Sequence, residues 1–262
     1  MQIQNGYRNI GIIVMALMSG YISSSTPAYS ATLSIENGYA DSGTQILLNT
    51  LLTVSNNEYI SAIQFDILYN PIACEITAVT AGNSSISAQK QVQYNTIASG
   101  QVRIIIAGLN QNTIPSGSIA QITFKICASA PAGIYDLLLT RAIASSPTGA
   151  SVPLSATNGN LSIQRSIYHS ADQNRDWKIS LTEVLRVVQL YNSGNFYCSC
   201  NTEDGYSITN SNKDCFPHNS DYYGGPNWKI QLYEILRLIQ LYNYGSYRSA
   251  VGTEDGFALG ST

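Results

Sequence analysis

Charged side chains are scarce in this chain of 262 residues. Asp, Glu, Lys and Arg make up 11% of the sequence, less than half of the share that is usual in globular proteins. The formal net charge is −3, so the chain lacks the basic excess that a nucleic-acid partner requires. The hydrophobic share of 44% is ordinary, so the low charge does not indicate disorder. We expect a folded protein and no nucleic-acid partner.

Long apolar runs are also missing, which predicts that the mature chain has no membrane span. The short apolar run Ile10–Leu17 follows Arg8, and Ala28-Tyr29-Ser30 precedes Ala31 as a cleavage site of small residues. Residues 1–30 therefore predict a secretory signal peptide, with an uncleaved anchor as the alternative. We expect a secreted protein, extracellular or at the cell surface.

Catalytic signatures are absent from residues 31–163. This part has no histidine, nucleophile elbow, phosphate loop or HExxH motif. A glycosidase needs two facing carboxylates, but the acids here are more simply solvated strand or turn residues. They are Glu36, Asp41, Glu58, Asp66, Glu75 and Asp136. We predict that the protein is not an enzyme.

Short runs of Ile, Leu, Val, Thr and Tyr fill residues 31–163, bounded by Gly, Pro, Asn and Ser. Several alternate with a period of two, as in Ile63–Ile67, where every odd position is apolar. Such strands without a long helical pattern predict an all-β sandwich or jelly roll. The predicted strands are Thr32–Ile35, Gln45–Val54, Ile60–Tyr69, Ile72–Thr80, Val92–Ile97, Gln101–Leu109, Ser118–Cys127, Ile134–Thr140 and Asn160–Ile163.

The segment Asp172–Glu183 spaces its oxygen-bearing side chains as a twelve-residue calcium loop does. Such a loop supplies side-chain oxygens from alternating positions, one backbone carbonyl and a final bidentate carboxylate. The segment therefore predicts Ca²⁺ as a cofactor. The predicted ligands are Asp172, Asn174, Asp176, the carbonyl of Lys178, Ser180 and Glu183.

Two features of this loop admit other interpretations. The position that is normally glycine, because the chain turns there with positive φ, is Trp177. Either the loop turns differently or the match is partly accidental. In addition, Ser180 and Glu183 form a capping box, which begins a helix with or without a metal.

The segment is repeated 51 residues later. WKISLTEVLRVVQLYNSG from Trp177 returns as WKIQLYEILRLIQLYNYG from Trp228, and TEDGY from Thr202 returns as TEDGF from Thr253. The second loop is two residues longer than the first, so we expect weaker or remodelled metal binding there. Its predicted ligands are Asp221, Asn227 and Glu234.

Each repeat predicts one short amphipathic helix, and together they predict a small all-α loop–helix unit over residues 164–262. The apolar positions on one face are Val184, Leu185, Val188 and Tyr191 in the first helix and Ile235, Leu236, Ile239 and Tyr242 in the second.

Several residues of the repeats leave alternatives open. Trp177 and Trp228 are sugar-stacking platforms or, more commonly, core anchors. The TEDG acids lend carboxylates to a metal or simply form turns. Arg186 and Arg237 contact their own helix face or a partner.

Five cysteines fit an oxidising compartment. Cys215 is expected to pair with Cys198 or Cys200, but connectivity cannot be deduced from sequence, and one cysteine is left over. A zinc site built from clustered cysteines with His169 and His218 is the alternative, although the spacing matches no zinc template.

An ordered set of motifs in residues 31–163 resembles the cohesin family. The set comprises ATLSIENGYADSG, ISAIQFDILYNP, IPSGSIAQITFKI, AGIYDLLL and NGNLSI. The resemblance implies a jelly-roll sandwich that binds a dockerin through one sheet face. The repeats of residues 164–262 resemble a dockerin, the calcium-dependent partner of cohesins, although Glu183 and Trp177 stand where dockerins usually have Asp and Gly.

These observations predict a signal peptide at 1–30, a cohesin-like sandwich at 31–163 and dockerin-like calcium-binding repeats at 164–262. The expected function is that of a secreted, non-catalytic adaptor in calcium-dependent assembly, with a link to polysaccharide degradation. The expected partners are cohesin- or dockerin-bearing proteins, including a second copy of the chain. The alternative is a carbohydrate-binding surface protein whose calcium repeats are only an anchor.

Overall fold

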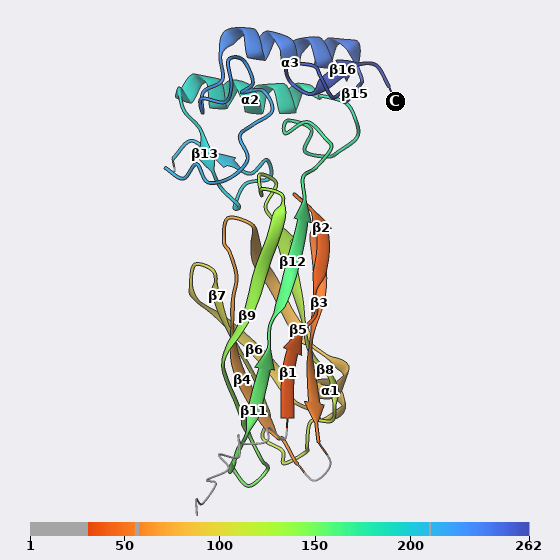
Figure 1. Ribbon diagram of the computed structural model, residues 1–262, viewed down its shortest axis with the longest axis vertical. Coiled ribbons are helices and arrows are strands. Elements are labelled where there is room, and N and C mark those ends of the chain that lie inside the picture. The colour runs from red at the N-terminus through yellow and green to blue at the C-terminus, as the bar shows by residue number, and fades with distance from the viewer. Residues whose placement is uncertain (1–30, 56–57, 210, 262) are drawn as a thin grey trace, which may run out of the picture.

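A long β-sandwich carries a small unit of two helices at one end (Figure 1). The computed structural model describes residues 31–55, 58–209 and 211–261, so the predicted signal peptide lies outside the described residues. None of the helices in these ranges is long and apolar enough to cross a membrane.

The sandwich consists of two sheets. One has the strand order β11-β1-β3-β8-β5, and the other has the order β2-β12-β9-β4-β7-β6, with β10 paired to β9. The elements are β1 (Ala31–Ile35), β2 (Gly38–Asp41), β3 (Gln45–Val54), β4 (Ala62–Leu68), β5 (Cys74–Ala81), α1 (Asn83–Ser87), β6 (Gln91–Ala98), β7 (Gln101–Ala107), β8 (Gly117–Ile126), β9 (Gly133–Ser145), β10 (Ser151–Val152), β11 (Leu154–Thr157) and β12 (Gly159–Gln164).

Period-two patterning positions the core between the sheets. Strand β1 alternates buried and partly exposed residues along its whole length, because successive side chains of a strand point to opposite faces. The core includes Leu33, Phe65, Ile104 and Phe124, each fully buried. All nine predicted strands are present and the all-β sandwich is confirmed. The sequence did not predict β2, β10, β11 or α1, which are short.

The repeat unit is not purely helical. Helices α2 (Leu181–Ser193) and α3 (Leu232–Tyr244) are each followed by a two-stranded hairpin. The hairpins are β13 (Tyr197–Cys198) with β14 (Tyr206–Ser207), and β15 (Tyr247–Ser249) with β16 (Phe257–Leu259). A distinct all-α unit is therefore not what the chain forms, because each TEDG turn closes a hairpin that packs on its helix.

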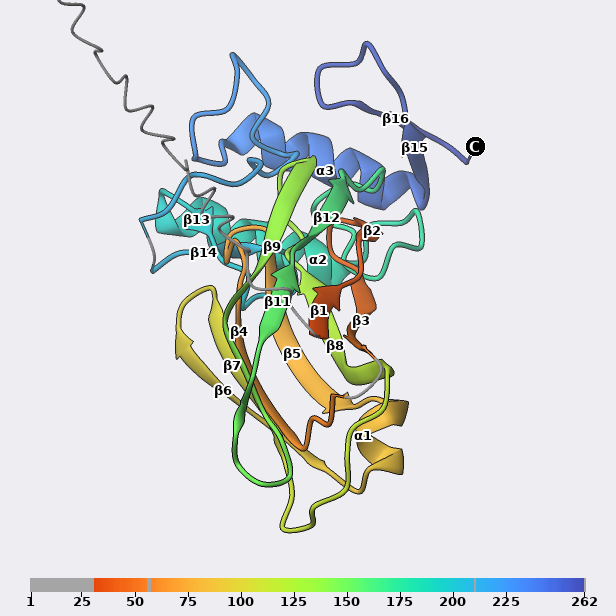
Figure 2. The same ribbon diagram turned by 60° about the horizontal axis from the view of Figure 1, so that its bottom comes forward.

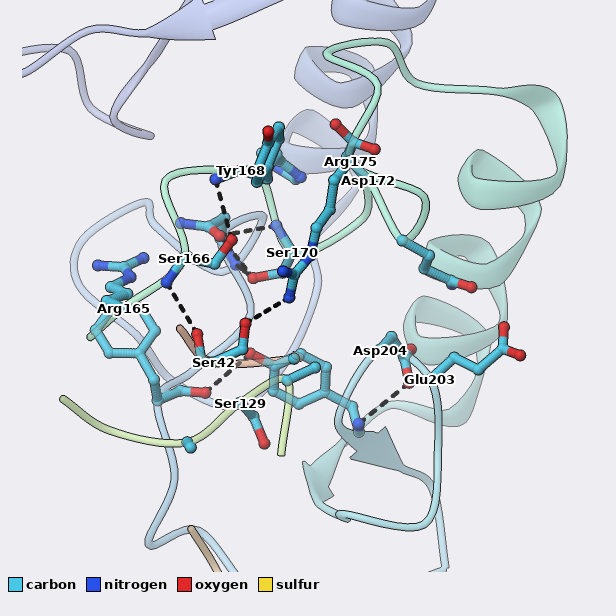
Figure 3. A pocket seen from close by; sticks show the side chains of 18 residues that line it. Ser42, Ser129, Arg165, Ser166, Tyr168, Ser170, Asp172, Arg175, Glu203 and Asp204 are labelled. Carbon is cyan, nitrogen blue, oxygen red and sulfur yellow. Dashed lines mark hydrogen bonds between the residues drawn. The ribbon is translucent and has the colours of Figure 1, made fainter. Parts of the chain in front are cut away.

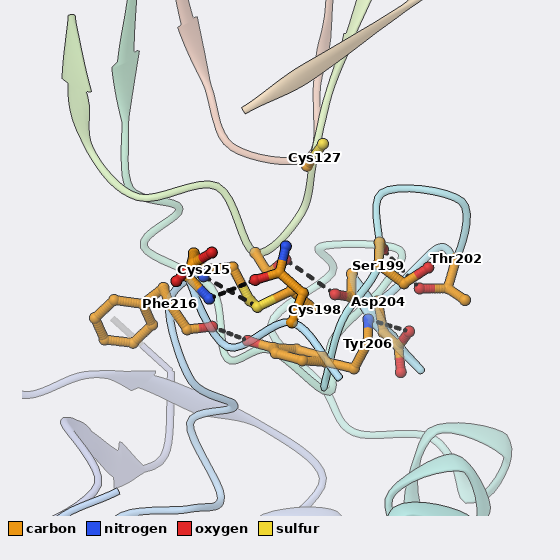
Figure 4. Close-up of a disulfide and its surroundings, with 12 residues drawn as sticks. Cys127, Cys198, Ser199, Thr202, Asp204, Tyr206, Cys215 and Phe216 are labelled. Atoms are coloured by element: carbon orange, nitrogen blue, oxygen red, sulfur yellow. Dashed lines mark hydrogen bonds between the residues drawn. A yellow bond between two sulfur atoms is a disulfide. The ribbon is translucent and has the colours of Figure 1, made fainter. Parts of the chain in front are cut away.

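Two disulfides organise the junction between the sandwich and the repeat unit, and Figure 4 shows the surroundings of one of them, Cys198–Cys215. Cys198–Cys215 closes a loop within the repeat unit, which is one of the two pairings expected for Cys215. Cys127–Cys200 joins the end of β8 to the β13–β14 loop and so links the two parts covalently. Cys74 is free and buried.

Polar and cationic contacts surround the junction disulfide. Ser129 donates its hydroxyl to the carbonyl of Gly205 at 2.9 Å and accepts the Phe216 amide on its own carbonyl at 2.8 Å. The Arg165 guanidinium lies 3.4 Å from the centre of the Phe216 ring, within cation–π range. The repeat unit is therefore held against the end of the sandwich by several independent contacts.

Thiol labelling checks this disulfide pattern. The native protein should take up no alkylating reagent, because Cys74 is buried and burial raises the pKa of its thiol to about 12. The unfolded, unreduced chain should take up one label, located on Cys74 by peptide mass spectrometry. Labelling of Cys127 or Cys200 in unreduced protein would contradict the covalent junction.

Candidate functional site

The first loop of the repeat unit is organised by the buried carboxylate of Asp172. Its Oδ1 accepts the Asp176 amide at 3.2 Å, and its Oδ2 accepts the Trp177 amide at 3.0 Å. The Tyr247 hydroxyl, from the other repeat, donates to Oδ2 at 2.6 Å. Burial raises the pKa of Asp172, and these donors oppose that rise. A carboxylate held in this way stabilises a tightly curled loop.

Trp177 adopts the left-handed conformation that the sequence led us to doubt. Its φ is 64°, and Trp228 in the second loop has a φ of 65°. The loop therefore turns as a calcium loop does at this position, although the residue is bulky. The backbone strain of such a residue is of the order of 1–3 kcal/mol, so the surrounding contacts must over-determine it.

Aromatic packing supplies those contacts, and it crosses between the repeats. The Trp177 ring lies 5.4 Å from the Tyr247 ring, and the Trp228 ring lies 5.2 Å from the Phe196 ring. The Tyr247 amide donates to the Trp177 carbonyl, and the Phe196 amide donates to the Trp228 carbonyl. Both tryptophans pack on the core of the repeat unit, as core anchors do. Each loop thus depends on the residue that follows the other repeat's helix.

The remaining predicted ligands of the first loop lie along its rim. The backbone amide of Asp176 donates hydrogen bonds both to the Asn174 Oδ1 and to the Asp172 carboxylate. The Asn174 side-chain amide in turn donates a hydrogen bond to the Asp176 carboxylate at 3.0 Å. The oxygens of Asp172 and Asn174 therefore converge on one point inside the loop. Asn174, Asp176, Lys178 and Ser180 are all exposed, so solvent or a cation reaches this rim.

Glu183 begins α2 in a capping box, as the alternative interpretation expects. Its Oε2 accepts the Ser180 amide at 2.7 Å, and the Ser180 hydroxyl accepts the Glu183 amide at 3.3 Å. Its Oε1 also accepts the Gln173 amide at 2.8 Å. Glu183 thereby joins the start of the loop to the start of the helix.

The second loop is closed by the two equivalent carboxylates, those of Asp221 and Glu234. Asp221 accepts the Asn227 and Trp228 amides, and Glu234 accepts the amides of Tyr222, Tyr223 and Gln231. Asn227 is exposed and its backbone amide is the group that binds Asp221. Asn227 directly precedes Trp228 and so stands where Asp176 stands in the first loop, whereas the stretch Gly224-Gly225-Pro226 leaves no counterpart of Asn174.

The aspartates of the two TEDG turns, Asp204 and Asp255, serve as partners of the helix arginines. Arg186 donates Nε to Asp204 at 2.7 Å and Nη2 to the Tyr206 carbonyl at 2.7 Å. Arg237 repeats the contact with Asp255 at 2.7 Å. These pairs fasten each hairpin to its helix, so both arginines contact their own repeat unit.

The two histidines lie buried at the centre of the repeat unit, 5.7 Å apart between ring centroids. Each Nδ1 accepts the backbone amide two residues ahead, that of Ala171 or Ser220, at 3.0 Å. Among the described residues, no three His, Cys, Asp or Glu side chains lie together in a way that could hold a metal ion. The cysteines nearby are paired in disulfides, which removes the thiolates that a zinc site would need.

A small polar cavity of about 60 Å³ separates the first loop from the sandwich (Figure 3). Arg175 reaches across it to the Ser42 carbonyl, and the Ser166 amide donates to the Ser42 hydroxyl at 2.9 Å. The cavity is much smaller than the roughly 300–1,000 Å³ of ligand pockets. It is part of the junction between the two parts of the chain.

A second candidate site lies on the outer face of the sheet that contains β9, β4, β7 and β6. Strand register aligns Ile105 and Ile143 on either side of Gln64, and Leu138 beside Leu68. Ile105 and Ile143 are 41% and 60% exposed. We call this surface the docking face, defined by Gln64, Asp66, Leu68, Arg103, Ile105, Leu138, Arg141 and Ile143.

A buried ion pair stands in the middle of the docking face. Asp66 is fully buried, and Arg103 donates Nε and Nη2 to it at 2.7 and 2.9 Å while Gln101 donates at 2.8 Å. The Arg103 hydrogen bonds lower the pKa of Asp66. The carboxylate therefore stays charged and fixes the arginine against the sheet.

Arg141 reaches the same face because β9 is irregular beside it. The register of β4 with β9 shifts between Gln64 and Asp66, and Arg141 has a φ of 51°. Such bulges re-aim a side chain and often mark functional positions. The Arg141 side chain is 68% exposed and lies 3.9 Å from Asp66. Sequence analysis did not identify this face, because its residues come together only through the register between strands that are distant in sequence.

The outer face of the other sheet is more polar. Asn49 accepts hydrogen bonds from the Ser118 hydroxyl and the Gln121 amide, and Thr32 bonds Ser155. Leu47 is the one large apolar side chain of this sheet's described residues that is as exposed as those of the docking face. The two faces of the sandwich therefore differ in chemistry.

The buried histidines predict that the repeat unit loses stability in mild acid. Burial lowers the pKa of His218 from 6.5 to about 4, and that of His169 well below its ordinary value. As pH falls through 6.5, the unfolded chain takes up protons that the folded chain cannot. Between about pH 7.5 and pH 5.5, His218 alone should lower the free energy of unfolding by about 1.4 kcal/mol.

Denaturant unfolding followed by tryptophan fluorescence at the two pH values measures this loss, since both tryptophans lie in the repeat unit. His218→Asn keeps an acceptor for the Ser220 amide and removes the titration, so its loss should be smaller. An equal loss in the variant would show that His218 is not the group responsible.

Comparisons with known proteins bear on the sandwich. One similar solved structure is the sixth cohesin of Acetivibrio cellulolyticus scaffoldin B, in complex with a Cel5 dockerin mutant. It is 18% identical to this chain with a TM-score of 0.47, and the match covers 52% of this chain and 99% of that one. A non-cellulosomal cohesin from Archaeoglobus fulgidus is 20% identical (TM-score 0.45; 52% and 91% covered). A Clostridium thermocellum cohesin–dockerin complex, Coh-OlpC–Doc435, is 13% identical (TM-score 0.48; 53% and 96%).

No curated protein gives a significant match to the chain. The family model of the cohesin domain matches residues 32–163, half of the chain. This chain therefore belongs to the cohesin family, whose domains are non-catalytic modules for protein–protein interaction.

Proposed function

We propose that this protein is a secreted adaptor that binds a dockerin-bearing partner through the docking face. The observation that carries the proposal is the contrast between the two sheets: one outer face displays Ile105, Ile143 and Leu138 around a fixed ion pair, and the other is mainly polar. Exposed apolar side chains with charged residues among them are typical of interaction surfaces. Two of the similar solved structures, those from A. cellulolyticus and C. thermocellum, are complexes with dockerins.

The docking face is suited to a helical partner. Strand register aligns the apolar side chains of the face in rows, and Arg103 and Arg141 add positive charge at the centre. The Asp66–Arg103 pair is already formed in the free chain, so little side-chain entropy is lost when a partner binds. A partner helix with apolar residues and an acidic side chain would complement this arrangement.

The repeat unit supplies a second adhesive surface in this proposal. On α2, Leu181 and Leu185 are exposed, and on α3 the equivalent residues Leu232 and Leu236 are exposed as well. Buried residues occupy the opposite side of each helix, including Val187 and Leu238. Both helices therefore present apolar residues to solvent that the unit's own core does not use, and a cohesin-bearing partner is the occupant we propose.

The junction determines how the two adhesive surfaces are used. Cys127–Cys200 holds the repeat unit at the end of the sandwich (Figure 1), so the helices cannot fold back along the sheet to reach the docking face of the same molecule. One chain would therefore connect two different partners, or copies would join head to tail. Such tethering raises effective concentration without new contacts.

Calcium is the cofactor that we propose for the first loop. Asp172, Asn174, Asp176, the Lys178 carbonyl, Ser180 and Glu183 would hold it, once Asp172, Asp176 and Glu183 move together, since in the described residues they form no group of three placed to hold a metal ion. Support comes from the left-handed turn at Trp177 and from the convergence of the Asp172 and Asn174 oxygens. A bound cation would offset the burial of the Asp172 carboxylate and order the start of α2. The second set, Asp221, Asn227 and Glu234, offers fewer oxygens and is expected to be the weaker site.

Substitution of the docking face tests the partner proposal. Ile143→Lys should weaken binding to a dockerin module about tenfold or more, because it replaces apolar burial with a charge that must be desolvated. Isothermal titration of the full chain against a panel of dockerin modules, with calcium present, measures the effect. Leu47→Lys makes the same change on the opposite face and should leave binding intact. Failure of every dockerin to bind, or equal effects of both variants, would reject the docking face.

Calcium titration tests the cofactor proposal. Calorimetry of the full chain should show one strong site, and Asp176→Asn should weaken it about tenfold or more, since a carboxylate ligand becomes neutral. Asp214→Asn removes one exposed carboxylate outside the loops and should leave the affinity unchanged. The absence of saturable binding at about millimolar calcium would mean that the hydrogen bonds described above suffice to hold the loop.

A further inference from the structure

The four edges of the two sheets are not equally protected against pairing with another strand. Sheet edges present unpaired backbone groups, which proteins usually block by shortness, charge or bulges. Strands β2 and β11 each have four residues, and β2 ends in Asp41. Strand β5 carries Glu75 and a bulge between Ile76 and Ala78. Three of the four edges thus have a recognisable block.

Strand β6 lacks such a block. Its eight residues, QVQYNTIA, include no charged residue, no proline and no glycine. Seven of them are exposed, and among the described residues β6 pairs only with β7. Its single irregularity falls at the end, between Thr96 and Ala98. Figure 2 shows β6 at the outer margin of its sheet.

The one charge that could protect this edge is turned inward. Lys90 immediately precedes β6, where a blocking lysine is commonly found. Its side chain is buried, and Nζ donates to the Ser61 hydroxyl and to the Asn110 carbonyl at 2.9 Å each. The ammonium group is therefore committed to the fold, and the edge beside it stays uncharged.

Side-chain alternation makes β6 compatible with a copy of itself. Register with β7 places Gln93 beside Ile105 and Asn95 beside Arg103, so Gln91, Gln93 and Asn95 lie on the docking-face side. Val92, Tyr94 and Thr96 lie on the other side. Amide side chains form ladders when identical strands stack, and β-branched and aromatic residues favour strand pairing. No like charges would meet across the interface.

We propose that β6 is a strand-addition site for a second copy of this chain. The two β6 strands would pair antiparallel about a two-fold axis, because an isologous contact places the same edge on both partners. The two sheets would then form one continuous sheet across the dimer. The docking faces of both copies would lie on that sheet, so the dimer would offer two partner sites where the monomer offers one.

The experiment measures the oligomeric state of the mature chain expected after signal cleavage, residues 31–262. Sedimentation equilibrium should show a monomer–dimer equilibrium between about 1 and about 500 µM, the range expected for one small interface. Amide exchange should slow in residues 91–98 as concentration rises. Exchange in β11, at another sheet edge, should not change.

A matched pair of variants tests whether the dimer contact lies at β6. Asn95→Lys adds a charge to the middle of β6 and should weaken the dimer about tenfold or more, since like charges meet across the paired strands. Thr157→Lys makes an equal change on the exposed edge strand β11 and should not weaken the dimer. Circular dichroism checks that both variants stay folded.

Three results would overturn the proposal: a monomer at every concentration, equal effects of the two variants, or a dimer without slowed exchange in residues 91–98. If the chain stays monomeric but a synthetic peptide of residues 91–98 binds and protects β6, an extended segment of another protein is the strand that pairs there.

Discussion

The Cys127–Cys200 disulfide is the constraint on which the architecture depends. Without it, the sandwich and the repeat unit would be two small modules joined through residues 164–170 and a few polar contacts. With it, the end of β8 and the β13–β14 loop are held together, and Ser129, Arg165 and Arg175 act over short distances. Linking two points 73 residues apart in sequence removes much of the freedom of the unfolded chain. The chain therefore behaves as one elongated body with fixed directions for its surfaces.

Within the repeat unit, duplication has preserved structure more strictly than ligand chemistry. Both repeats retain the buried aspartate, the helix-capping glutamate, the left-handed tryptophan and the arginine–aspartate pair. The second repeat has Asn227 in place of Asp176 and no counterpart of Asn174. The shared carboxylates accept hydrogen bonds from backbone amides, so removing one of them would leave those donors unsatisfied. The shared tryptophans pack on the core of the repeat unit. The residues that differ are exposed, where a change costs the fold little.

Much of the sandwich followed from the sequence because strands such as β1 and β7 alternate buried and more exposed residues with a period of two. The pattern of Ile63–Ile67 predicts both the strand and its buried face. The short strands β2, β10 and β11 were missed because two to four residues carry no periodic signal. Helices α2 and α3 were predicted from their apolar spacing, but the hairpins were not, since Asp204 and Asp255 reveal their role only through contact with Arg186 and Arg237. The docking face depends on register between strands distant in sequence, which a single sequence does not contain.

The crossed packing of the two tryptophans has a consequence for how the repeat unit forms. The strained turn at Trp177 is supported by Tyr247, and the turn at Trp228 is supported by Phe196. Neither loop can reach its final conformation until the helix of the other repeat is in place, so the first repeat must wait until the second has left the ribosome. The unit is therefore expected to fold in a single late step, in which its two halves acquire order together.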